Sequence, residues 1–390
     1  MTAEWYDLGQ RLHAAHTRRP ADRLAHAPIT AAPCPVAVRA HRDGDSVTIA
    51  AAAPGVPAST ATGRDAFELL ASLGVTLAAD TPATLVTDDP RTLPLLHTIA
   101  LTAPADSEHD AVAAHIAWWR DRADFPGGRA VVDTLDACRT RWTLGEAPTA
   151  ERQPSTWRRW LTIPDDSTTG LLDLHTRLSD GEPLQWLDVL SEDDEWSYGA
   201  AQSALSDGFD WRRRDTTTRA ALGLRSRCDA ADLYAAALLS DPLYRDRARH
   251  TGHVVTGTAH QPQPDKSRRI DVTCTRMDAR LRPGNTVTGW TGTPTTTNAL
   301  PFTAQVHTAT VRAGRLVLSL TGTTGLGAPP NGARVTLMPS PPSPSLQRRG
   351  RSTYRALYSA RRSWLTTGRT PTPTRRPVPL DVLVAGAEPS

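Results

Sequence analysis

Lysine is almost missing from this sequence. Lys266 is the single lysine among the 44 Lys and Arg residues of the 390-residue chain. The chain is also rich in Ala, Pro, Gly and Thr, a combination typical of genes with a high G+C content. The choice of arginine over lysine therefore says little about function. The positions of the arginines say more, because coding pressure does not sort charge along a chain.

Cysteine and long apolar runs are scarce as well. The four cysteines form no CxxC pair, so we expect reduced, buried thiols in a cytoplasmic protein. No stretch reaches the ~18–20 uncharged apolar residues of a membrane span, so we expect no such span. Residues 1–20 are charged and lack the apolar core of a secretory signal, so we expect no such signal. The cysteines are Cys34, Cys138, Cys228 and Cys274.

Signatures of nucleotide binding and covalent catalysis are also missing. Residues 55–64 have the wrong glycine spacing for a P-loop, and Arg64 stands where that motif has lysine. Residues 325–332 begin as GxG but continue into two prolines, so no helix can start there and receive a phosphate. There is no GxSxG motif. The sequence therefore predicts no nucleotide cofactor.

What the sequence does contain is a lopsided distribution of charge. Residues 263–390 carry 18 basic and 5 acidic residues, a net charge of 18 − 5 = +13. Residues 1–262 carry 26 basic and 36 acidic residues, a net charge of 26 − 36 = −10. Such asymmetry indicates an anionic partner for the basic part, with nucleic acid or a membrane surface as the usual candidates. The alternative is that the two parts neutralise each other, within one chain or between copies.

The order of the predicted elements indicates an α+β protein. Residues 1–105 show an N-terminal helix and a strand–strand–helix–strand pattern with an Asp-Gly hairpin turn, which predicts a small α/β unit. Residues 106–259 repeat apolar side chains at helical spacing, which predicts a bundle of five or six helices with tryptophans in its core. Residues 260–267 form a polar linker that contains proline.

The period of the apolar pattern changes to two beyond this linker. Residues 268–340 hold five short strands rich in Thr and Val and separated by Gly and Pro, which predicts a small closed β-barrel of OB-like or SH3-like size. Residues 341–390 form a basic appendix rich in Pro and Arg, in which residues 352–365 have a helical pattern.

The stretch 348–376 carries the strongest functional signal, with nine arginines and no acidic residue. We expect the arginines to contact nucleic-acid phosphates, and interleaved aromatic rings are weaker candidates for base stacking, as is Trp290. The alternative is that the rings pack on the barrel and the arginines remain solvated. The candidates are Arg348, Arg349, Arg351, Arg355, Arg361, Arg362, Arg369, Arg375, Arg376, Tyr354, Tyr358 and Trp364.

Two further patterns suggest metal chemistry more weakly. Asp43 and Asp45 follow one predicted strand, and Asp88 and Asp89 follow another, so these carboxylates could converge around Mg²⁺ in a metal-dependent nuclease. Turns and helix caps favour Asp at the same positions without any metal. His250 and His253 have the i, i+3 spacing of zinc ligands, but no Cys or acidic partner lies close to them in sequence.

The main prediction is a cytoplasmic, non-catalytic protein that binds DNA or RNA through its basic C-terminal third, with the acidic body available to a protein partner. It needs no cofactor. One alternative is the metal-dependent nuclease, with Mg²⁺ as its cofactor. The other is a self-assembling scaffold protein in which basic and acidic parts of different subunits meet.

Overall fold

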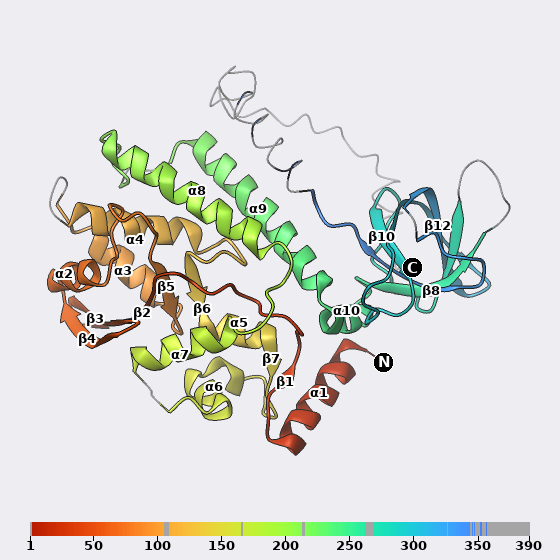
Figure 1. The fold of residues 1–390 in the computed structure, drawn as a ribbon, viewed down its shortest axis with the longest axis horizontal. Coiled ribbons are helices and arrows are strands. Elements are labelled where there is room, and N and C mark those ends of the chain that lie inside the picture. The colour runs from red at the N-terminus through yellow and green to blue at the C-terminus, as the bar shows by residue number, and fades with distance from the viewer. Residues whose placement is uncertain are drawn as a thin grey trace, which may run out of the picture. The chain divides into compact units, whose positions relative to one another are not determined.

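The computed structural model describes residues 2–104, 109–164, 167–212, 215–261, 269–325 and 327–343, together with four separate positions further on. The fold is mixed α+β: helices and a five-stranded sheet come first, and a closed antiparallel β-barrel of six strands comes last (Figure 1). The chain divides into two compact units, Met1–Arg213 with Arg227–Pro344, and Arg214–Ser226 with Ser345–Ser390. The barrel and the candidate metal ligands discussed below lie in the first unit, and the arginine-rich stretch 348–376 belongs to the second.

The five-stranded sheet has the order β4-β3-β2-β5-β6. β2, β3 and β4 form an antiparallel meander, whereas β5 runs parallel to β2, and β6 runs parallel to β5. The predicted hairpin is confirmed: Asp43 pairs with Ser46, and Gly44 takes the left-handed φ of 58° that the tight turn requires. The strands are β2 (Pro35–Asp43), β3 (Ser46–Ala53), β4 (Val56–Thr62), β5 (Thr84–Thr87) and β6 (Val131–Asp133).

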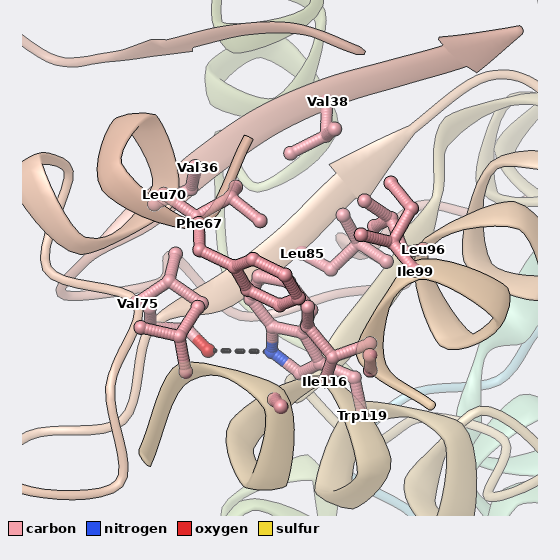
Figure 2. Packing of buried hydrophobic residues seen from close by; sticks show 14 of the residues in the cluster. Val36, Val38, Phe67, Leu70, Val75, Leu85, Leu96, Ile99, Ile116 and Trp119 are labelled. Atoms are coloured by element: carbon pink, nitrogen blue, oxygen red, sulfur yellow. Dashed lines mark hydrogen bonds between the residues drawn. The ribbon is translucent and has the colours of Figure 1, made fainter. Parts of the chain in front are cut away.

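Apolar side chains on one face of this sheet build the largest core (Figure 2). Phe67 from α2 (Asp65–Ser72), Leu96 from α3 (Thr92–Ala100) and Trp119 from α4 (Asp110–Arg122) pack against Val38 and Leu85. The Trp119 indole N–H donates to the Ala83 carbonyl over 2.8 Å, so its polar atom is satisfied within the core. α7 (Thr168–Leu178) covers the opposite face.

The remaining helices surround this sheet and add smaller cores. Trp157 on α6 is fully buried, as expected for the tryptophans of this part, whereas Trp196 on α8 is 57% exposed. The expectation of buried thiols is correct for Cys138 and Cys274 and wrong for Cys34 and Cys228, which are exposed. These elements are α1 (Ala3–Thr17), β1 (Ala21–Asp22), α5 (Thr134–Arg141), β7 (Trp142–Thr143), the 3-10 helix η1 (Ala150–Arg152), α6 (Pro154–Leu161), α8 (Leu187–Ser206), α9 (Thr217–Ser240) and α10 (Pro242–Arg249).

Buried ion pairs connect the helices to the loops. Asp194 on α8 is 1% exposed and accepts from the Arg122 Nε over 2.6 Å. Its other oxygen accepts from the backbone N–H groups of Arg129 and Ala130, which lead into β6. Gly128 permits this approach, because a Cβ there would lie 2.7 Å from the Asp194 carboxylate.

Ion pairs also orient α1. Arg247 on α10 donates to both carboxylate oxygens of Asp7, over 2.7 and 2.8 Å, and Arg11 binds Glu151 over 2.6 and 3.0 Å. As a result the polar side of α1 faces its neighbours, and Trp5 on the other side is 66% exposed.

The barrel has the strand order β10-β11-β12-β9-β8-β13 and closes through the pairing of β13 with β10. A closed barrel is therefore confirmed, with six strands where the sequence predicts five. The strands are β8 (Val255–His260), β9 (Ile270–Cys274), β10 (Thr286–Thr291), β11 (Phe302–Arg312), β12 (Arg315–Thr324) and β13 (Arg334–Pro339).

The additional strand is β8, which lies ahead of the predicted linker 260–267. β8 pairs with β9, so this linker segment connects two strands of the barrel instead of preceding it. Gly257 interrupts the Val/Thr pattern of β8, and for this reason the sequence pattern does not predict this strand. The same glycine lets β9 approach, since a Cβ there would lie 2.5 Å from the Thr273 carbonyl.

Candidate functional site

The described part of the barrel is strongly basic. Residues 269–343 contain seven arginines and two aspartates, a net charge of 7 − 2 = +5. Two open concavities lie on this barrel, and arginine and one histidine line each of them. The arginines are Arg269, Arg276, Arg280, Arg282, Arg312, Arg315 and Arg334.

The first concavity has a volume of about 510 Å³ and lies between β8, β9 and the β11–β12 turn. Its basic side chains are His260, Arg276 and Arg315, and no Asp or Glu among the described residues lines it. Hydroxyl groups from outward-facing threonines of the strands complete it. A concave surface with these donors suits an anion with several oxygen atoms. The full lining is Thr258, His260, Thr273, Cys274, Thr275, Arg276, Met277, Gly314 and Arg315.

The second concavity has a volume of about 410 Å³ and is lined by His253, Arg280, Leu281, Asn285, Thr286, Pro339 and Ser340, again without a carboxylate. The Arg280 guanidinium donates to the His253 Nε2 over 3.2 Å, so Nδ1 carries the imidazole proton and donates to the Thr251 hydroxyl over 2.9 Å. Burial and the neighbouring Arg280 charge hold the pKa of His253 below its ordinary value.

The segment 275–281 connects the two concavities. A small recess lined by Thr275, Arg276, Asp278 and other residues shares Thr275 and Arg276 with the first concavity and ends next to Arg280 of the second. The turn at Gly252 holds this segment in place: its carbonyl accepts from the Arg280 N–H over 2.8 Å. Asp278, the carboxylate of the recess, binds Arg276 over 2.5 and 2.8 Å.

The two weak candidates for zinc ligands, His250 and His253, both face guanidinium groups. The His250 Nε2 lies 3.3 Å from the Arg249 Nη2, and its ring lies tilted by 33° to that of Tyr6, with centroids 5.1 Å apart. His253 faces Arg280, as above. Within the described ranges, no group of three or more His, Cys, Asp or Glu side chains is arranged to hold a metal ion.

Trp290 is not available for base stacking, contrary to expectation. It is 5% exposed, its indole N–H donates to the Thr293 carbonyl over 3.0 Å, and the Arg245 guanidinium lies 5.0 Å from its ring centroid. Phe302, the other ring among residues 269–343, is 1% exposed. The described barrel surface thus offers cations and hydroxyls, and no exposed Phe, Tyr or Trp ring.

The structure does not bring the two pairs of candidate nuclease carboxylates together. Asp88 is 4% exposed at the carboxyl end of β5, next to Arg39 of β2. Asp43 lies four residues beyond Arg39 on β2. At ~3.3 Å per residue, its Cα lies about 13 Å along the strand from that of Arg39. Asp45 follows at the tip of the hairpin, where both aspartates are exposed.

Asp88 instead receives two guanidinium groups. Arg39 donates to its two oxygens over 2.9 and 2.7 Å, and Arg158 from α6 donates over 3.1 Å. A divalent cation at Asp88 would have to displace these donors. Asp89 in turn binds Arg91 over 2.8 Å, which lowers the pKa of the Asp89 carboxyl. Sequence reasoning missed Arg39 and Arg158, although Arg39 is a charged residue inside an apolar strand.

All twelve candidates between Arg348 and Arg376 lie outside the described residues, so the structure assigns them no contacts. Within the described ranges, no helix is both long and apolar enough to pass through a bilayer. Comparison with protein-family models, curated proteins and solved structures gave no match. The function is therefore argued from these residues alone.

Proposed function

We propose that this protein binds nucleic acid through its basic C-terminal third, contacts the phosphate backbone and catalyses no reaction on it. The observation that carries the proposal is the pair of barrel concavities, each lined by Arg and His with hydroxyl or amide donors and, among the described residues, by no carboxylate. Backbone binding requires only such a cationic, donor-rich surface. We further propose that the barrel is of the OB-like or SH3-like type and that the protein is cytoplasmic.

The basic appendix follows the barrel directly in the sequence. Ser340 lines the second concavity, and Arg348 follows eight residues later in sequence. An arginine-rich segment tethered so close to a cationic concavity has a high effective concentration for the same polyanion. Its arginines, from Arg348 to Arg376, would add phosphate contacts, and the acidic body would remain available to a protein partner.

The mode of binding follows from the side chains on the described barrel surface. Contacts that guanidinium and hydroxyl groups make with phosphate oxygens carry no direct information about base sequence. Since Trp290 and Phe302 are buried, the described barrel provides no stacking platform. We therefore expect affinity that depends steeply on salt and weakly on sequence.

The test is fluorescence anisotropy of labelled DNA and RNA, single- and double-stranded, with the full chain over a salt series. Changing Arg280 and Arg315 to Ala should reduce the slope of log K against log salt by about 1 per arginine. Arg91→Ala is the matched control, because this exposed arginine lies on the α/β part, where it binds Asp89. Absence of binding at low salt, or an equal loss in the control, would refute the proposal.

The same preparation tests the two alternatives. Degradation of the nucleic acid that stops with a chelator and is lost in Asp88→Ala would support a metal-dependent nuclease instead. Self-association that weakens with salt and needs no nucleic acid would support assembly through basic and acidic surfaces. The contacts of Asp88 with Arg39 and Arg158 do not favour the nuclease.

A further inference from the structure

Each concavity pairs its arginines with one histidine. His260 lies with Arg276 and Arg315 in the first concavity, and His253 lies with Arg280 in the second. Both histidines are exposed, so their imidazoles are accessible to a ligand. Histidine is the side chain whose charge ordinarily changes between about pH 5 and 8. The charge of each concavity therefore depends on pH in a range where arginine does not titrate.

We infer that His253 and His260 are phosphate ligands of the barrel and that each takes up a proton when a polyanion binds. This inference rests on the proposed function. In the free protein, Arg280 uses the His253 Nε2 as an acceptor, which requires a neutral ring. A phosphate placed between the two groups would accept from both and favour the protonated imidazole.

The other charged groups around the two histidines are compatible with proton uptake. His253 faces Arg280, whose charge opposes protonation until an anion compensates it. His260 pairs across the strands with Asp271, and Arg276 and Arg315 share its concavity. Asp271 is bound by Arg269 and Ser319 and faces Arg312, so its charge is compensated within the barrel.

Linkage fixes the direction of the effect. Because a bound phosphate favours the protonated form, the pKa of a ligating histidine is higher in the complex than in the free protein. Affinity therefore increases as the pH falls from about 8 to about 6, and two histidines together produce an increase of about tenfold. The appendix cannot supply this dependence, since residues 341–390 contain no histidine.

The experiment measures the Kd of the full chain for a labelled DNA duplex at about pH 8 and about pH 6, at constant ionic strength. The wild type should bind about tenfold more tightly at the lower pH. The variant His253→Gln with His260→Gln should lose this dependence, because glutamine keeps a donor but takes up no proton. His307→Gln is the matched control, since His307 is exposed on β11 and lines neither concavity.

The possible outcomes distinguish a failure of this inference from a failure of the proposed function on which it rests. Binding that does not change with pH, or a dependence that survives in the double variant, overturns the inference and leaves the proposed function standing. No binding at either pH overturns the proposed function. Inorganic polyphosphate as a competitor should show the same pH dependence, and a dependence confined to nucleic acid would refute phosphate as the group recognised.

Discussion

Asp194 is a single carboxylate on which three segments of the chain depend. It is 1% exposed and joins α8 to Arg122 of α4 and to the backbone that leads into β6. Burial opposes its charge and raises the pKa of its carboxyl, so its hydrogen bonds must compensate for the cost of desolvation. Its importance is structural, because no side chain of either concavity contacts it.

We predict that Asp194→Ala reduces the free energy of unfolding by about 3 kcal/mol, because it leaves the buried Arg122 without its closest partner. Urea unfolding followed by circular dichroism measures the change. Glu195→Ala is the matched control: Glu195 is 54% exposed and binds only Arg129 among the described residues, so its loss should cost less than about 1 kcal/mol. Equal effects in both variants would contradict the role assigned to Asp194.

His115 makes the stability of the body depend on pH. It is fully buried between Trp118, Trp119 and Tyr198, and burial lowers its pKa from 6.5 to about 4. Between these two values the unfolded chain binds a proton that the folded chain does not. The stability contributed by the neutral ring is therefore complete above about pH 6.5 and is lost as the pH falls toward 4.

We predict that acidification from pH 6.5 to 5 lowers the free energy of unfolding by about 2 kcal/mol through His115 alone, at about 1.4 kcal/mol per pH unit. His175 adds a change of the same sign, since burial lowers its pKa to about 4 as well. Urea titrations at both pH values should show a smaller difference in His115→Gln and an unchanged one in His41→Gln, an exposed control. An undiminished pH dependence in His115→Gln would contradict this assignment.

Among the elements, the turn around Gly252 has the most direct link to the candidate site. Gly252 has a left-handed φ of 76°, and a Cβ there would lie 2.0 Å from the Asp278 carbonyl. The turn can therefore approach the 275–281 segment only because residue 252 has no side chain. This contact places Arg280 next to His253 and thereby shapes the second concavity.

We predict that Gly252→Ala displaces this segment and costs about 1–3 kcal/mol more stability than Gly284→Ala, since it adds a backbone clash to the left-handed strain. Gly284 also has a left-handed φ, of 90°, but a Cβ there meets nothing within 4 Å. The midpoint temperature of thermal unfolding and the affinity for DNA should both decrease more in Gly252→Ala than in Gly284→Ala. Similar losses in the two variants would mean that the close contact does not shape the concavity.

Elements whose pattern is local could be predicted from the sequence. α1 and the β2–β3 hairpin, with its turn at Gly44, appear where expected, and the alternation of Thr and Val predicted a closed barrel. The missed strands lack a clear local pattern: β4 (VPASTAT) is small and polar and contains Pro57, β6 has three residues next to a helix, and β8 contains Gly257. Their strand character comes from partners distant in sequence, and no local pattern records those.

The candidate site was less predictable for the same reason. His253 and Arg280 are far apart in sequence and meet only because the turn and the barrel fold together. For Asp88, the sequence correctly predicts a position after a strand. It does not predict the two arginines that bind this carboxylate, because Arg39 comes from β2 and Arg158 from α6. The basic regions could be predicted from the residue types alone, whereas the concavities could be found only in the tertiary structure.

At the scale of the whole molecule, we predict that barrel and appendix contribute separately to nucleic-acid binding. Changing Arg361 and Arg362 to Ala should reduce the salt slope by about 2 and leave the pH dependence intact, since the appendix has no histidine. Changing His253 and His260 to Gln should remove the pH dependence of binding and leave the contribution of the appendix to the salt slope intact. Anisotropy with each variant and with the combination measures both, and loss of both properties from either change alone would contradict this separation.

The pairing of β13 with both β8 and β10 has a consequence for how the protein is made. A nascent chain has synthesised five strands of the barrel before the sixth can close it, so β8 must wait for its second neighbour across a long interval of sequence. Such non-local pairing is slow and leaves strand edges open meanwhile. Pro339 and Ser340, which complete the second concavity, arrive with that last strand. The growing chain thus completes the second concavity only when β13 joins the barrel, and the most basic stretch, 348–376, follows β13 in the sequence.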